Sequence, residues 1–156
     1  MNYKETIAWL YEQFPYYQKD GKTAYKKDID NVLNFFNQNG EYYSLFDTIH
    51  IGGTNGKGSV SHMLSSILQE SGYKTGVFTS PHILDFRERI KINGKKISKS
   101  FIVDFVQNHN NQFSDMQMSF FEMNVAMAFK YFSEQQVDLS IVEVGLGGRL
   151  DATNVI

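Results

Sequence analysis

The stretch His50-Ile51-Gly52-Gly53-Thr54-Asn55-Gly56-Lys57-Gly58-Ser59 decides the fold. Its glycines allow the backbone to curl until successive N–H groups point at one anion. An apolar-ended run, residues 46–51, leads into it, and a helical pattern over residues 59–70 follows. This order of strand, glycine-rich loop and helix is typical of a phosphate-binding loop, in which a helix N-terminus and a lysine hold the phosphates.

The spacing within this loop differs from the common pattern G-x-x-x-x-G-K-[ST]. Ile51 stands where the first glycine would be, and Gly58 separates Lys57 from Ser59. Ser59 could supply a metal-binding hydroxyl, by analogy with the common loop, or it could simply cap its helix. We therefore predict a phosphate loop of an unusual kind, and Gly58 argues against a plain P-loop kinase.

The composition fits one globular domain or a large part of one. The chain has 156 residues, of which 42% are hydrophobic and 21% charged, with a net charge of −2. This charge shows no basic excess for nucleic acid, and no apolar run is long enough to span a membrane. The chain has no cysteine, and its four histidines lack zinc-ligand spacing. We expect a cytoplasmic protein that binds neither nucleic acid nor membrane.

Alternation of apolar runs with helical patterns predicts an α/β fold, a mostly parallel sheet with flanking helices and a small β-hairpin insertion. The expected parallel strands cover residues 46–51, 75–79 and 138–144. Asn93-Gly94 predicts the turn of the hairpin, between strands 89–92 and 95–97. The expected helices cover residues 3–14, 29–39, 59–70, 98–113 and 119–135, with a loop over 16–25. In the third of these helices we expect an inward apolar face, formed by Val60, Met63, Leu64, Ile67 and Leu68.

Two polar residues are expected at the edge of the sheet where parallel strands end, which is where ligands bind in such folds. Glu143 lies near the C-terminal end of a strand that reads as buried on both faces, and a buried carboxylate needs a partner such as Mg²⁺. Ser80 ends the preceding strand, and Pro81 holds its turn. The alternatives are a glutamate facing solvent and an ordinary turn serine.

Ser119-Phe120-Phe121-Glu122 has the S-x-x-E spacing of a capping box, which alone would explain Glu122. Phe121 could equally be a core residue. Arg149 and Asp151 lie in a glycine-containing loop after Glu143, where a surface salt bridge is the simple alternative to a binding role.

Five segments occur in the order found in one known family. They are GGTNGKGS (52–59), TSPHI (79–83), ERIKING (88–94), FFE (120–122) and EVGLGGRLDATN (143–154). Together they resemble folylpolyglutamate synthase and its bifunctional form, dihydrofolate synthase, in the Mur ligase superfamily. The resemblance covers nearly the whole chain, and its last motif is long and specific.

The resemblance implies an ATP-dependent ligase that adds L-glutamate to folate or dihydropteroate through an acyl phosphate. Within the nucleotide loop, it assigns ATP to Gly53, Thr54, Asn55, Gly56, Lys57, Gly58 and Ser59, with Lys57 and Glu143 in catalytic roles. It makes Ser80 and Glu143 the Mg²⁺ ligands, with Ser59 ranked after Ser80. It places the pterin pocket at Ser119, Phe120, Phe121, Glu122, Leu150, Asp151 and Ala152, where Phe121 could lie against the ring and Asp151 could bond its polar edge. The connector 82–92 resembles a mobile loop near the folate site.

The same resemblance implies that residues 1–156 are the N-terminal part of the ATP-binding domain, with its remainder and a C-terminal glutamate-ligase domain absent. We therefore expect a monomer when complete and little ligase activity from this part alone. Residues 24–27 depart from the family pattern, which puts their part of the pterin site in doubt. Two other interpretations stay open, namely a non-catalytic nucleotide-binding fragment and a cell-wall Mur ligase.

Overall fold

The computed structural model describes residues 1–13 and 28–156. The predicted loop over 16–25 and the departure at 24–27 lie outside these residues. The elements in chain order are α1 (Tyr3–Gln13), α3 (Asp30–Asn39), the 3-10 helix η2 (Tyr42–Leu45), β1 (Asp47–Ile51), α4 (Lys57–Glu70), β2 (Thr75–Phe78), the 3-10 helix η3 (Phe86–Arg89), β3 (Ile90–Ile92), β4 (Lys95–Lys96), α5 (Lys99–Asp115), α6 (Phe120–Glu134) and β5 (Leu139–Glu143).

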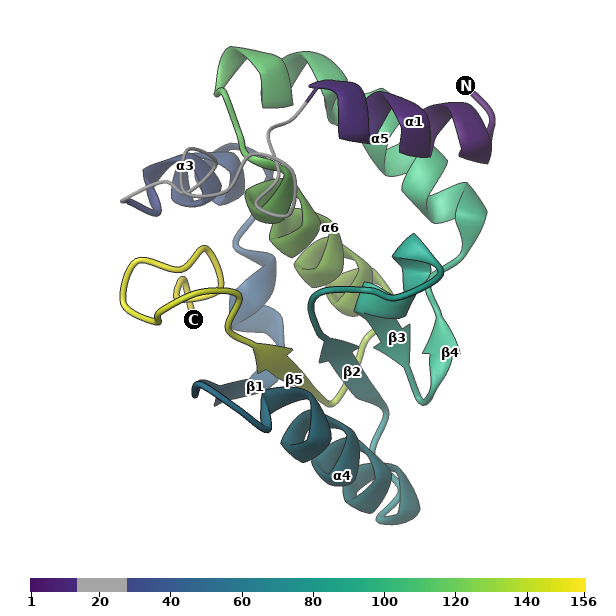
Figure 1. The fold of residues 1–156 in the computed structure, drawn as a ribbon, viewed down its shortest axis with the longest axis vertical. Coiled ribbons are helices and arrows are strands. Elements are labelled where there is room, and N and C mark those ends of the chain that lie inside the picture. Colours follow the sequence, from purple (N-terminus) through teal and green to yellow (C-terminus); the bar gives the residue numbers. More distant parts are fainter. Residues whose placement is uncertain (14–27) are drawn as a thin grey trace.

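A five-stranded sheet in the order β1-β5-β2-β3-β4 forms the middle of the molecule (Figure 1). The strands β1, β5 and β2 are parallel, whereas β3 pairs antiparallel with β2 and with β4. The predicted parallel sheet is therefore confirmed, and the hairpin extends the same sheet. Asn93 and Gly94 both have positive φ, 46° and 73°, as the predicted two-residue turn requires.

Helix α6 covers one face of the sheet and lies at the centre of the core. Ten of its 15 residues are buried, and α3 and α5 pack against its other side (Figure 1). The phenylalanines of these helices meet in an aromatic cluster, in which Phe36 lies 5.8 Å from Phe129 and Phe35 lies 5.5 Å from Phe113. This cluster holds the layer of helices to the sheet by burial of large apolar side chains.

Helix α4 covers the opposite face with a different side than the sequence predicts. Only Ser61 and Ser65 are buried in it, whereas Val60, Met63 and Ile67 are 40%, 59% and 61% exposed. The predicted inward face is therefore wrong for these three residues. The small serines let α4 lie close to β2 and β5, and this turns the bulkier side chains outward.

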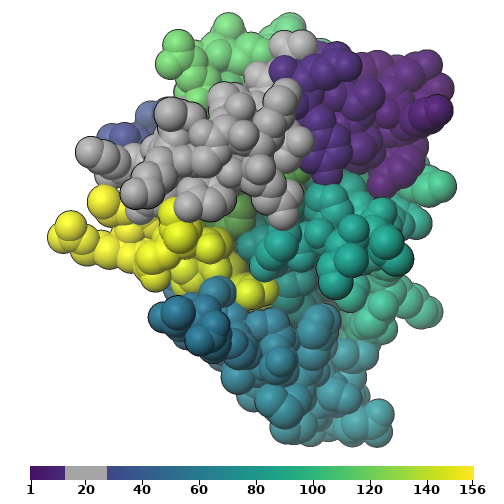
Figure 2. Space-filling view, viewed as in Figure 1, coloured from purple at the N-terminus to yellow at the C-terminus, as the bar shows by residue number. Residues whose placement is uncertain are grey.

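The residues that follow β5 fold back over the C-terminal end of β1. Figure 2 shows them on the surface beside the β1–α4 segment, and His50 Nε2 lies 2.8 Å from Thr153 Oγ1. Among the described residues, no helix combines the length and the apolar character that crossing a membrane requires. The strand end, the glycine loop and the C-terminal residues thus meet at one edge of the sheet.

Candidate nucleotide and metal site

The glycine-rich loop joins β1 to α4 and leaves the helix N-terminus open. Gly56 is the N-cap of α4 with φ of 81°, a left-handed conformation that suits glycine, and no side chain caps the helix. Residues 52–56 are all exposed. The first N–H groups of a 14-residue helix are therefore available to an anion, with the positive end of the helix dipole behind them.

Lys57 is the first residue of α4, so the helix begins two residues earlier than predicted. Its Nζ donates a hydrogen bond to the carbonyl oxygen of Gly53, at 2.9 Å, across the loop. Ser59 lies within the first turn and is not the cap, which corrects the alternative interpretation of this residue. The geometry thus keeps a lysine directly over the exposed loop, where it can reach phosphate oxygens.

Ser80 and Glu143 meet at the same edge, as the sequence predicts. Glu143 ends β5 beside Ile51 of β1, and its Oε2 accepts a hydrogen bond from the backbone N–H of Ser80 at 3.2 Å. Glu143 as a whole is only 5% exposed. Three neighbouring strands therefore bring the loop, the serine and the buried carboxylate together.

Burial raises the pKa of Glu143, while the N–H of Ser80 and the charges of Lys57 and His62 act in the opposite direction. A buried carboxylate with a single hydrogen bond from the described residues fits a cation, which would satisfy its remaining oxygen capacity. No three acidic or histidine side chains gather as a metal site in the described residues. One carboxylate and one hydroxyl suit Mg²⁺, because that ion takes its other ligands from phosphates and water.

The predicted substrate residues 119–122 begin helix α6 and lie largely inside the protein. Ser119 Oγ accepts from the N–H of Glu122 at 3.2 Å, and Glu122 Oε2 accepts from the N–H of Ser119 at 2.6 Å. The capping box is therefore confirmed, and Ser119, Phe120 and Glu122 are buried. Only Phe121 of this group is partly exposed.

Phe121 connects this helix start to the loop after β5. Its ring lies so near Gly145 that an added Cβ there would be 2.4 Å from Phe121 Cζ. The ring also lies 5.8 Å from Phe78 of β2. The structure thus places Phe121 against the start of the loop that contains residues 150–152.

Asp151 organises the loop over 145–154. It is 3% exposed, and its carboxylate accepts from the N–H groups of Leu146 and Thr153, at 2.7 and 3.0 Å, and from the Thr153 hydroxyl. Thr153 in turn contacts His50, whose pKa is lowered by burial, with Asp151 acting against the shift. Ala152 is buried and Leu150 partly exposed. The pterin role of these residues stays a prediction.

Two residues near this edge were missed at the level of sequence. His62 of α4 acts to lower the pKa of Glu143, and Arg89 lies buried beside the Ser80 turn. Charged residues in a polar connector suggest a surface position, so nothing in the segment 82–89 indicates that Arg89 is buried. A usable signal is the antiparallel hairpin itself, because it pairs Arg89 with Thr79, the residue before Ser80.

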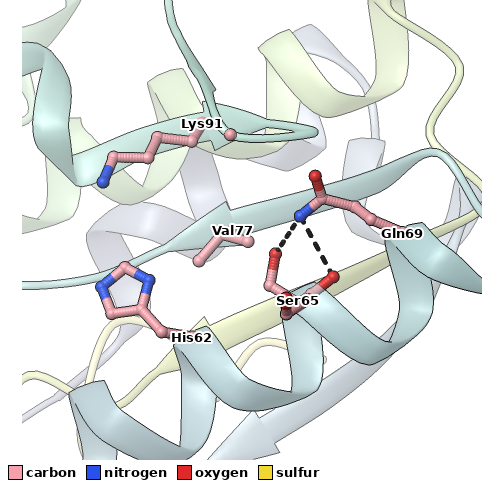
Figure 3. A pocket seen from close by; sticks show the side chains of 7 residues that line it. His62, Ser65, Gln69, Val77 and Lys91 are labelled. Atoms are coloured by element: carbon pink, nitrogen blue, oxygen red, sulfur yellow. Dashed lines mark hydrogen bonds between the residues drawn. The ribbon is translucent and has the colours of Figure 1, made fainter.

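A separate hollow of about 170 Å³ lies between α4 and the β2–β3 strands (Figure 3). His62 and Lys91 border it from opposite elements, and Val77 contributes an apolar wall. Gln69 Nε2 bonds the carbonyl and the hydroxyl of Ser65, so these polar groups satisfy each other. Among the described residues, none of the buried side-chain polar atoms without a hydrogen-bond partner belongs to this hollow.

Comparison with known proteins gives consistent relatives over the whole chain. The folylpolyglutamate synthase of Lacticaseibacillus casei is 36% identical over 100% of the chain, and the dihydrofolate synthase/folylpolyglutamate synthase of Bacillus subtilis is 36% identical over 99%. The chain spans 36% of the length of each of these relatives. No family model matches the chain.

Solved structures agree with these relatives. The folylpolyglutamate synthase of Thermotoga maritima matches 99% of the chain with a TM-score of 0.87 and 40% identity, and the chain covers 35% of it. The Mycobacterium tuberculosis enzyme with ADP matches 99% of the chain with a TM-score of 0.84 and 33% identity, at 34% coverage of that protein. A folylpolyglutamate synthase complex with AMPPCP and folate matches all of it with a TM-score of 0.79 and 34% identity, at 38% coverage. By sequence and by fold, the chain belongs to the family of folylpolyglutamate and dihydrofolate synthases, over about a third of the length of these relatives.

Proposed function

We propose that this chain supplies the nucleotide and Mg²⁺ site of an ATP-dependent ligase that joins L-glutamate to folate or dihydropteroate. The observation that carries the proposal is the meeting of Lys57, Ser80 and Glu143 at one strand edge, beside an uncapped helix N-terminus. The relatives bear the names of such synthases, and solved ones hold ADP, AMPPCP and folate.

The physical requirement of this reaction is to bring a triphosphate and a carboxylate together against their mutual repulsion. The open N–H groups of α4 and the ammonium of Lys57 provide a positive field at the loop. Glu143 and Ser80 would hold Mg²⁺, which stabilises charge on phosphate oxygens when it is bound. The chain's own residues would thus orient the phosphates, and the carboxylate substrate would bind beside them at the same edge of the sheet.

The pterin assignment to residues 119–122 and 150–152 belongs to the same proposal. It is supported by the contact of Phe121 with Gly145, the first residue of the loop that leads to residues 150–152. A cytoplasmic location, a monomeric full-length protein and the use of L-glutamate are proposed with it, and they rest on the relatives' activity. Because the chain spans about a third of these relatives, the proposal concerns its contribution to the ligase.

Titration of MgATP into the 156-residue chain tests the nucleotide site. Lys57→Ala should weaken binding about ten- to a hundredfold, since it removes a charged hydrogen-bond donor. Lys95→Ala, at an exposed lysine of the hairpin, is the matched control and should leave the affinity within about twofold. Calorimetry measures both.

The same titration repeated at several Mg²⁺ concentrations tests the metal ligands. Ser80→Ala should weaken the Mg²⁺-dependent part of binding more than Ser59→Ala. Equal MgATP affinities for the wild type and Lys57→Ala would overturn the proposed nucleotide site. A larger effect of Ser59→Ala than of Ser80→Ala would assign the metal-binding hydroxyl to the loop instead. Preference for a UDP-linked acid over folate would instead favour a cell-wall ligase.

A further inference from the structure

The connector between β2 and β3 contains two arginines with different surroundings. Arg87 lies at the surface and pairs with Asp85, its Nη2 being 2.7 Å from Oδ2. Arg89 points inward and is 5% exposed. The two acids of the segment are both committed elsewhere, because Asp85 also contacts Lys96, and Glu88 bonds the backbone N–H groups of residues 83–85 and lies near Lys96.

Arg89 is therefore a buried cation without an acidic partner in residues 1–13 and 28–156. Its Nε donates to His82 Nδ1 at 2.7 Å, and no terminal nitrogen donates to a described residue. Burial lowers the pKa of its guanidinium to about 10. An arginine remains charged at neutral pH even so, and a desolvated charge needs a counter-charge.

The surroundings hold this guanidinium in one orientation. His82 accepts at Nδ1, so its Nε2 carries the proton and donates to Tyr11 Oη at 2.9 Å. The guanidinium carbon lies 5.4 Å from the centre of the Phe120 ring, on which Tyr11 stacks at 5.2 Å. With Nε fixed and one face against a ring, the two terminal nitrogens form a preorganised fork.

The chemistry around the fork selects the kind of acid. Phe120 lies against it, and the rings of Tyr11 and Phe86 lie 5.2 and 6.1 Å from the Phe120 ring. Ile83 and Leu84 of the same connector are 87% and 90% exposed. Such surroundings suit a flat aryl carboxylate better than a zwitterionic amino acid, whose ammonium group would lose its water there. The backbone carbonyl of Arg89 accepts a hydrogen bond from the N–H of Thr79, the residue before Ser80. The guanidinium therefore belongs to a residue held next to the strand end that carries the proposed metal ligand Ser80.

We propose that the terminal nitrogens of Arg89 bind the carboxylate of an aryl acid in a bidentate pair, next to Phe120. This inference rests on the proposed function, because it gives the acid substrate a residue that neither the motifs nor the relatives' names assign. The carboxylate would neutralise the buried cation, and the exposed tips at residues 83 and 84 would cover the ring of the bound acid.

The probe is 4-aminobenzoate, the carboxyl end of dihydropteroate, compared with its neutral amide, 4-aminobenzamide. The wild-type chain should bind the acid about ten- to a hundredfold more tightly than the amide, as expected for a charged bidentate pair. Arg89→Gln should abolish this preference, and Arg89→Lys should restore only part of it because an ammonium lacks the planar fork. Arg87→Gln is the matched control and should retain the preference.

Binding of MgATP, measured on the same samples, separates this inference from the proposed function. A wild-type chain that binds MgATP but does not prefer the acid to the amide overturns the inference alone, whether or not the Arg89 variants fold. The inference is also overturned if Arg89→Gln keeps the preference for the acid. It is overturned as well if the wild-type chain binds L-glutamate but not the aryl acid. A chain that binds neither MgATP nor the aryl acid overturns both.

Discussion

Helices α4 and α6 begin at the same edge of the sheet, yet their N-termini are built in opposite ways. Helix α6 starts with a capping box in which Ser119 and Glu122 satisfy each other's backbone N–H groups. Helix α4 starts at Gly56 with no side-chain cap. The first arrangement satisfies its own donors, whereas the second leaves them for an anion.

The same two helices also differ in how they contact the sheet. Ten residues of α6 are buried, but only Ser61 and Ser65 of α4 are. The difference indicates that α6 contributes most of the burial that stabilises the fold, whereas α4 carries the loop proposed to bind nucleotide. The stability of the chain and its affinity for nucleotide should therefore respond to different substitutions.

Truncation of one methionine in each helix should produce the largest contrast. Met123→Ala in α6 removes a fully buried side chain and should lower the free energy of unfolding by about 2–5 kcal/mol. Met63→Ala in α4 removes a side chain that is 59% exposed and should change it by no more than about 0.5 kcal/mol. Urea unfolding measures both, and equal losses would contradict the division of roles.

Serine substitutions at the two helix starts should give a smaller contrast. Ser119→Ala removes the cap of α6 and should cost about 1 kcal/mol of stability. Ser59→Ala, in the uncapped first turn of α4, should change stability by less than about 0.5 kcal/mol. If thermal unfolding shows an equal loss for Ser59→Ala, then the start of α4 is not open.

Acid should weaken the core side of the molecule through His109, which is the smallest expected effect. Burial is the main cause that lowers the pKa of His109 below 6.5, and its ring lies against Phe105 and Phe113. The unfolded state then binds more protons, so stability is constant above pH 6.5 and falls as pH drops through the folded-state pKa. His109→Gln should remove part of this fall in unfolding experiments between about pH 7.5 and 5. An unchanged slope would assign it to other groups.

Features set by neighbours in sequence could be predicted. The capping box at Ser119, the turn at Asn93-Gly94 and the buried strand that carries Glu143 each depend on residues a few positions apart, and all three are confirmed. The meeting of Ser80 with Glu143 could be predicted as well, because the ends of parallel strands share one edge.

Features set by the packing of distant elements could not be predicted. The apolar periodicity of α4 indicated a face with Val60, Met63 and Ile67, but the sheet accepts the serine side. The start of α4 at Lys57 depends on the left-handed backbone of Gly56. A glycine can adopt this conformation but does not have to, so the residue type alone does not predict it. The burial of Arg89 depends on Tyr11 and Phe120, which lie far from it in the sequence.

The position of β1 at the edge of the sheet has a consequence for the order of assembly. Its only strand partner in the described residues is β5, which comes last in the chain. During synthesis the strand that carries the phosphate loop must therefore wait until almost all of residues 1–156 have been made, while α5 and α6 can already pack locally. The strand that leads into the glycine-rich loop is thus among the first parts of the sheet to be made and among the last to gain its support.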